Sequence, residues 1–120
     1  MTPPTETEGQ ASLAAVLAAL SSEMSLAAVA CCELDDALGQ ILQATPPEEQ
    51  MKVMQQLHVV DLLAQHVTAI TDFTASLAQA ADQETSLNFH QALSTITLGA
   101  VAERLRAAIA EAEAEVQRAA

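Results

Sequence analysis

The sequence contains few of the residues that build β-sheets. Aromatic residues make up 2% of the 120 residues: Phe73 and Phe89 are present, and tryptophan and tyrosine are absent. Strands favour aromatic and β-branched side chains, whereas Ala, Leu, Gln and Glu lose little conformational freedom in a helix. The composition therefore predicts an all-α protein, and a chain of this length predicts a single domain.

Basic residues are also scarce. The chain carries 16 acidic residues against four basic ones, which gives a formal net charge of -12. Nucleic acids and anionic membranes bind clusters of Lys and Arg, so this charge excludes both as expected partners. The basic residues are Lys52, Arg104, Arg106 and Arg118.

Long apolar runs and glycine-rich loops are missing as well. No uninterrupted apolar run approaches the ~18 residues of a membrane span, and residues 1–9 lack the features of a signal peptide, so we expect a cytoplasmic protein. The three glycines form no phosphate loop, and no HExxH or GxSxG motif occurs. His58 and Asp61 have the spacing of one half of a metal site in a helical bundle, but the second half is missing. We therefore expect no cofactor or metal of its own.

The remaining pattern divides the chain into a tail and three helical segments. Residues 1–9 are rich in Pro, Thr and Glu, which predicts a disordered tail, and residues 10–120 are expected to form one helical bundle domain. The first helix should end at Thr45, because a residue before proline avoids the helical region. A break at Ser21-Ser22 is the alternative. The expected inward seam of this helix is Leu13, Leu17, Leu20, Met24, Ala27, Cys31, Leu34, Leu38 and Ile41.

The second and third helices should complete an elongated antiparallel bundle of three long helices around a helical hairpin. The third helix is expected from Thr85 or Ser86, either of which could cap it, to about Gln117. Three slender, alanine-rich helices bury little area, so we expect a partner or a second copy, giving a homodimer, to complete the bundle. The second helix, from Pro47 to Ala81, should face inward with Val53, Leu57, Val60, Ala64, Val67, Ile70, Thr74 and Leu77.

An acid followed four residues later by a glutamine occurs twice, as Asp61 with Gln65 and Asp36 with Gln40. Residues four apart lie on the same side of a helix, so the acid and the amide of each pair can address one small target. The first pair belongs to a polar stripe opposite the apolar side of the second helix, and we expect this stripe to be exposed. Its members are His58, Asp61, Gln65, Thr68 and Asp72.

The DxxxQ pattern on a helix resembles the catalytic signature of the CheZ-type chemotaxis phosphatases, which dephosphorylate the response regulator CheY. Asp61 lies about 20 residues before the expected turn, which is similar to the placement in that family. The segment from Leu34 to Leu42 (LDDALGQIL) is similar to the FQDLTGQVI of those proteins. We take Asp61 and Gln65 as the main candidate pair and Asp36 and Gln40 as the alternative. The length also resembles that of the small CheT proteins of chemotaxis operons.

The resemblance implies that Gln65 positions water for attack on an aspartyl phosphate and that Asp61 pairs with a lysine of a CheY-type receiver, which itself holds Mg²⁺. CheZ proteins also carry a C-terminal segment that tethers CheY, and this chain has the Ala/Glu-rich stretch Glu111–Ala120 instead. Two functions therefore stay open. One is a response-regulator phosphatase, and the other is a non-catalytic module that binds another chemotaxis component such as the methyltransferase CheR.

Overall fold

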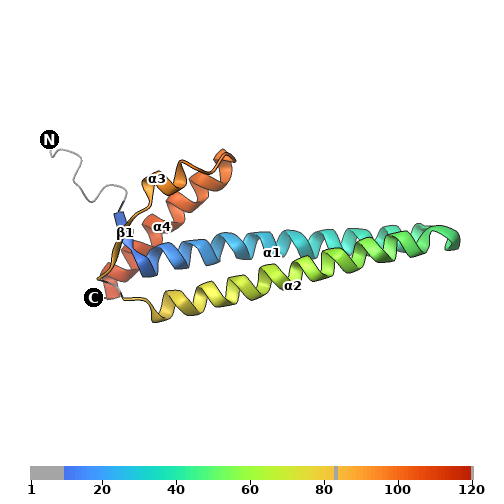
Figure 1. The fold of residues 1–120 in the computed structure, drawn as a ribbon, viewed down its shortest axis with the longest axis horizontal. Coiled ribbons are helices and arrows are strands. Elements are labelled where there is room, and N and C mark those ends of the chain that lie inside the picture. The colour runs from blue at the N-terminus through green and yellow to red at the C-terminus, as the bar shows by residue number, and fades with distance from the viewer. Residues whose placement is uncertain (1–9, 83, 120) are drawn as a thin grey trace. The chain divides into compact units, whose positions relative to one another are not determined.

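A computed structural model describes residues 10–82 and 84–119. Helices dominate it, which confirms the all-α class, and a small two-stranded sheet is added to them (Figure 1). The expected disordered tail, residues 1–9, lies outside the described residues. The elements are β1 (Gln10–Ser12), α1 (Leu13–Ala44), the 3₁₀ turn η1 (Pro47–Glu49), α2 (Gln50–Ala80), β2 (Ser86–Asn88), α3 (His90–Leu93) and α4 (Gly99–Ala119).

The first helix is continuous, so the alternative of a break at Ser21-Ser22 is wrong. It begins with a capping interaction in which the Ser12 Oγ accepts a hydrogen bond from the Ala15 N–H at 3.1 Å. It ends just before Pro46 and Pro47, as expected, and Pro47 then occupies the first position of η1. The two prolines thus separate α1 from α2.

The expected third long helix is wrong in its first part. Ser86–Asn88 instead forms β2, which pairs antiparallel with β1, and Leu87 lies opposite Ala11. After the short α3, the hydroxyl of Thr95 donates to the Ala92 carbonyl at 2.7 Å, and such local bonds compete with helix propagation. The helix resumes only at Gly99. Pairing with a distant segment therefore overrides the local helical preference.

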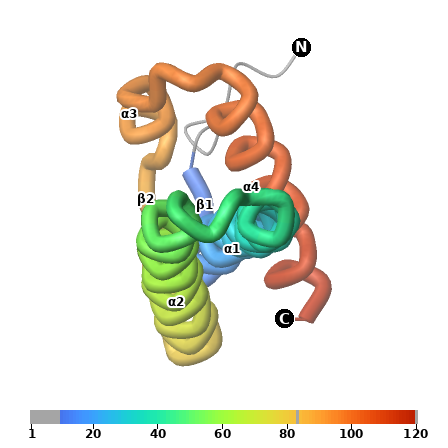
Figure 2. The backbone as a smooth tube through the Cα atoms, turned by 90° about the vertical axis from the view of Figure 1, so that its right-hand side faces the viewer, coloured from blue at the N-terminus to red at the C-terminus, as the bar shows by residue number. Residues whose placement is uncertain are grey.

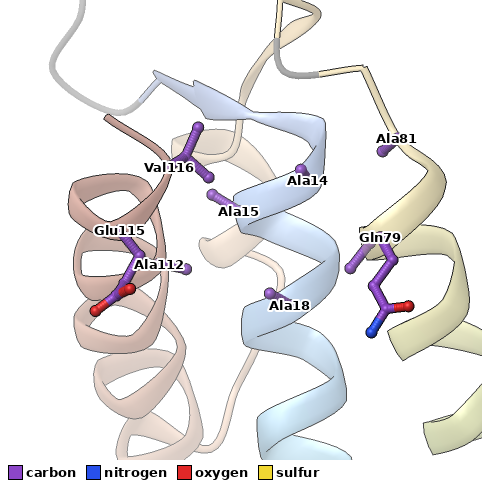
Figure 3. Close-up of a pocket in the computed structure, with 9 residues that line it drawn as sticks. Ala14, Ala15, Ala18, Gln79, Ala81, Ala112, Glu115 and Val116 are labelled. Carbon is purple, nitrogen blue, oxygen red and sulfur yellow. The ribbon is translucent and has the colours of Figure 1, made fainter. Parts of the chain in front are cut away.

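The chain forms two compact units. The terminal unit contains residues 1–23 and 71–120, and the hairpin unit contains Met24–Ile70. In the terminal unit, β1 and β2 pair (Figure 2), and the start of α1 lies between α4 and the end of α2 (Figure 3). Its core is small: Ala11, Ala15, Ala19 and Ile109 are buried, with Val16, Phe89, Leu105, Ala108 and Ala112 around them.

Two carboxylates of the terminal unit connect α4 to its neighbours, Glu113 to β1 and Glu23 to α1. Glu113 Oε2 accepts hydrogen bonds from the Ser12 N–H at 3.0 Å and the Ser12 hydroxyl at 2.8 Å. Burial raises the pKa of Glu113, but these bonds and one from Gln117 outweigh burial and hold it below its ordinary value. Glu23 pairs with Arg104 at 2.6 Å, and the hydrogen bond from Arg104 lowers the pKa of Glu23.

In the hairpin unit, the end of α1 and the start of α2 lie side by side and are joined by η1 (Figure 1). The expected inward side of α2 is largely confirmed, although Ile70 and Leu77 are exposed. Thr74 is buried, and the other expected positions are half-buried, namely Val53, Leu57, Val60, Ala64 and Val67. In the hairpin-unit part of α1, half-buried residues recur at alternating spacings of four and three, and Gly39 is half-buried as well. We call these recurring positions the α1 seam: Met24, Ala28, Cys31, Asp35, Leu38 and Leu42.

The expected seam of α1 is partly wrong. Leu20, Ala27, Leu34 and Ile41 were expected inside, but all four are exposed, Leu34 by 47% and Ile41 by 52%. Asp35 and Leu42, each one residue further along, take the places of the last two. A shift of one residue turns the side chain by about 100° around the helix, so the inward side of α1 is rotated relative to the most hydrophobic stripe of its sequence.

One described helix, α1, meets the length and composition criteria for a membrane span. By length and composition, α1 is apolar enough, since an 18-residue window has a mean hydropathy of 1.8. The expectation counted uninterrupted apolar runs, whereas an alanine-rich helix with scattered polar residues keeps a high mean. Core helices of soluble proteins pass the same test, and the cytoplasmic location stays a prediction.

Candidate functional site

The main candidate pair lies on α2 within the hairpin unit. Gln65 Nε2 donates a hydrogen bond to Asp61 Oδ2 at 3.0 Å, and both residues are exposed. A carboxylate can only accept, so the amide nitrogen is the engaged end of Gln65. The carbonyl Oε1 of Gln65 is the end that can accept a hydrogen bond from an incoming molecule.

The polar stripe around this pair is exposed, as the sequence predicted. His58 and Thr68 flank the pair along the hairpin-unit part of α2, and both are exposed. Asp72, the last member, is also exposed and belongs to the terminal unit. The helical period alone was therefore sufficient to predict the exposure of the stripe.

An open groove of ≈ 360 Å³ runs beside Asp61 between α1 and α2. Three ionisable side chains reach it, namely Asp35, His58 and Asp61. Asp35 is half-buried, whereas the other two are exposed. The other residues that line the groove are Leu42, Met54 and Leu57, and they give one part of the groove an apolar wall.

The alternative pair lies on α1 of the hairpin unit. Asp36 and Gln40 are both exposed on α1, and neither lines the groove beside Asp61. Within the described part of the chain, no hydrogen bond joins Asp36 to Gln40. A Cβ at the intervening Gly39 would meet nothing within 4 Å, so the surface there is open. Among the residues that the structure describes, no hydrogen bond joins one pair to the other.

Asp35 is the residue of this site that sequence reasoning missed. It lies seven residues after Ala28 and seven before Leu42, so it has the spacing of the α1 seam. The neighbouring Leu34 also has heptad spacing and is far more hydrophobic than Asp35. Leu34 was therefore expected in the seam. The heptad spacing of 28, 35 and 42 was the signal that could have identified Asp35.

Comparison with known proteins covers nearly the whole chain. Residues 9–119 match a family described as a domain of unknown function, DUF8776. The chain belongs to this family. No curated protein and no solved structure matches it. The match includes the parts of both units that the structure describes, so the DUF8776 domain contains the candidate pair and the groove.

At this site, the Asp61–Gln65 pair of the DUF8776 domain offers hydrogen bonds and a negative charge. Across residues 10–82 and 84–119, no group of three or more His, Cys, Asp and Glu side chains is placed to hold a metal ion. Gln65 has no basic group and cannot remove a proton, but its amide can orient a water molecule. Asp61 can accept a hydrogen bond from a cationic side chain.

Proposed function

We propose that this protein binds a phosphorylated CheY-type receiver domain and accelerates the hydrolysis of its aspartyl phosphate through Asp61 and Gln65. The observation that carries the proposal is the exposed, hydrogen-bonded pair on α2 beside the groove. In this proposal the helices act as an elongated antiparallel bundle around the α1–α2 hairpin, in the cytoplasm, and the receiver supplies the phosphorylated aspartate, Mg²⁺ and a lysine.

The proposed step is an in-line displacement at phosphorus. Gln65 Oε1 accepts a hydrogen bond from a water molecule and holds its oxygen opposite the acyl oxygen of the phosphoaspartate. A bond forms between the water oxygen and phosphorus, and the bond from phosphorus to the receiver's carboxylate oxygen breaks. Inorganic phosphate leaves with the water proton, or releases that proton to solvent, and the carboxylate is restored. Positioning of this kind lowers the barrier without a strong base.

Asp61 has a docking role in this proposal. It accepts a hydrogen bond from the receiver's lysine, which its second carboxylate oxygen can do while Oδ2 keeps the bond from Gln65 at 3.0 Å. That bond would then hold the Gln65 side chain in place while Oε1 binds the water molecule. The formal charge of -12 favours encounter with the Lys- and Mg²⁺-bearing rim of a receiver.

A second function is supported by the apolar wall of the same groove. Leu42, Met54 and Leu57 line it, and an apolar groove with a charged edge can hold a partner without any reaction. In that case the protein is an interaction module for another chemotaxis component such as the methyltransferase CheR.

The deciding experiment follows the loss of labelled phosphate from the receivers of the same cell with and without the protein. Gln65→Ala should reduce the acceleration about 10²-fold, as removal of one stabilising group does in other enzymes. The fold should be unchanged, because exposed substitutions usually alter stability by less than about 0.5 kcal/mol. The matched control is Gln55→Ala, which removes an exposed glutamine of the same helix with no acid four residues before it.

Three results separate the alternatives. Loss of acceleration in Gln40→Ala but not in Gln65→Ala would transfer the role to the pair on α1. Equal rates for Gln65→Ala and Gln55→Ala would remove Gln65 from the mechanism. If no receiver loses phosphate faster but CheR binds the protein, the interaction module replaces the phosphatase.

A further inference from the structure

Each helix of the hairpin unit has a third apolar position in its heptads, in addition to the two that contact the other helix. Leu34 and Ile41 are seven residues apart on α1, and Leu63 and Ile70 are seven apart on α2. All four are exposed, although the heptads already provide two half-buried positions for the contact between α1 and α2. Two apolar positions per heptad suffice for a helix with one neighbour, whereas a third is typical of a helix that buries a wider stripe.

These exposed residues share one side of the hairpin. On α1, Leu34 and Ile41 each directly precede a seam residue, and on α2, Val59 and Leu63 directly precede the half-buried Val60 and Ala64. In an antiparallel pair of right-handed helices, stepping back by one residue on each helix turns both side chains by about 100° toward the same side. The groove lies on the other side, because Asp61 and His58 follow Val60 and Leu57. We call the side with Leu34, Ile41, Val59, Leu63 and Ile70 the acid-free face.

The acid-free face lacks the acidic side chains that dominate the charge of the whole chain. Within the hairpin unit, the residues of α1 that directly precede seam positions are all apolar. They are Ala27, Ala30, Leu34, Ala37 and Ile41. On α2 the corresponding positions contain Lys52 and His66 but no acid. In a chain with net charge -12, this is a surface that can meet its own copy without carboxylates facing carboxylates.

The size of the acid-free face also fits a second copy. Residues 24–45 of α1 extend roughly 33 Å, and two helices with axes about 10 Å apart present a surface roughly 20 Å wide. The product is roughly 650 Å² per copy, or about 1,300 Å² for a pair, which lies within the range of specific, stable interfaces. On α1, small alanines alternate with Leu34 and Ile41, so the large side chains of one copy can pack over the alanines of the other.

We propose that the acid-free face binds the acid-free face of a second copy, so that two hairpin units form a four-helix bundle. Asp61 and Gln65 stay accessible in this dimer, because they lie on the groove side. The inference is independent of the proposed phosphatase activity.

The test measures the mass of the full chain by sedimentation equilibrium at several concentrations. The wild type should approach twice 12.5 kDa. Leu34→Glu should weaken the dimer by more than about 10²-fold, because it buries an unpaired charge. The matched control is Leu26→Glu: Leu26 is 52% exposed on the same helix but off the acid-free face, so this variant should remain a dimer.

A second matched pair on α2 guards against an effect on folding. Leu63→Glu should dissociate the dimer, whereas Leu62→Glu should not, although these adjacent leucines are 48% and 41% exposed. Circular dichroism should show the same helix content in all four variants. A monomeric wild type, or equal dissociation by Leu34→Glu and Leu26→Glu, would overturn the proposal. So would a monomer that binds phosphatidylcholine vesicles through Leu34, since the face would then contact lipid.

Discussion

At the residue scale, the most unusual position is Asp35. Asp35 is half-buried in the α1 seam, where its neighbours along the helix are Cys31, Leu38 and Leu42. A charged group at a helix contact loses part of its hydration. Such a residue is typically retained for a reason other than stability, and Asp35 shares the groove with Asp61.

We predict that Asp35→Leu stabilises the protein. Leucine would fill the seam position without the desolvation of a charge, and the free energy of unfolding should rise by about 0.5–2 kcal/mol, the range for substitutions that optimise such sites. Urea denaturation at neutral pH measures this change. Asp36→Leu is the matched control, because Asp36 is exposed and should give no comparable gain. A loss of stability in Asp35→Leu would show that the carboxylate makes a favourable interaction in the folded state.

The candidate site could be predicted in part at this scale. The exposure of Asp61 and Gln65 follows from the period of one helix, and the structure confirms it. The groove could not be predicted, because it depends on which residues of α1 face α2. Leu34 and Asp35 both have heptad spacing, and only the packing of the two helices decides between them.

At the scale of elements, the start of α1 depends on a single serine. Ser12 caps the helix through the Ala15 N–H and also donates two hydrogen bonds to Glu113 of α4. One side chain therefore determines where α1 begins and connects it to a helix from the other end of the sequence.

Ser12→Ala should lower the free energy of unfolding by about 1 kcal/mol through the lost cap, and by more through the hydroxyl bond to Glu113. Ser25→Ala changes an exposed serine within the same helix and should be neutral or slightly stabilising, because alanine is the better helix former. Thermal unfolding of the two variants gives the comparison. Equal melting temperatures would mean that the cap contributes little.

The elements also show where sequence reasoning succeeded and failed. The first two helices were predictable because each carries a long periodic pattern and two prolines separate them. The β-strands were not, because Gln10–Ser12 and Ser86–Asn88 are too short to show a pattern and form only by pairing across the chain. The third helix was therefore expected to start where β2 begins.

At the scale of the whole molecule, the excess of acidic groups opposes the compact state, while individual carboxylates support it. Glu113 and Glu23 have pKa values below the ordinary 4.5 in the folded protein. A lowered folded pKa means that the stabilisation is fully present above the unfolded pKa and disappears as the pH falls through the folded pKa. Acid therefore removes these two contributions while it relieves the general repulsion.

Glu113→Gln should separate the stabilisation by the Glu113 carboxylate from the general repulsion between acidic groups. The variant should be less stable than the wild type at pH 7, and the difference should shrink below about pH 4.5 and vanish once Glu113 is protonated. Urea denaturation across pH 3–7 measures the difference directly, and the general repulsion largely cancels in the comparison. Glu111→Gln, at an exposed position of the same helix, removes the same charge and should show no such pH-dependent loss. A constant difference across this pH range would contradict the assignment.

The hydrogen bond from Ser12 to Glu113 joins residues that are 101 positions apart, and this separation determines the order in which the chain can fold. Contacts in the hairpin unit join residues close in sequence, so they form quickly, whereas closing the terminal unit requires the two ends of the domain to meet. During synthesis the start of α1 leaves the ribosome long before its partner α4 exists. We therefore expect the hairpin to form on the nascent chain. The N-terminal turn of α1 should become stable only after the last helix has left the ribosome.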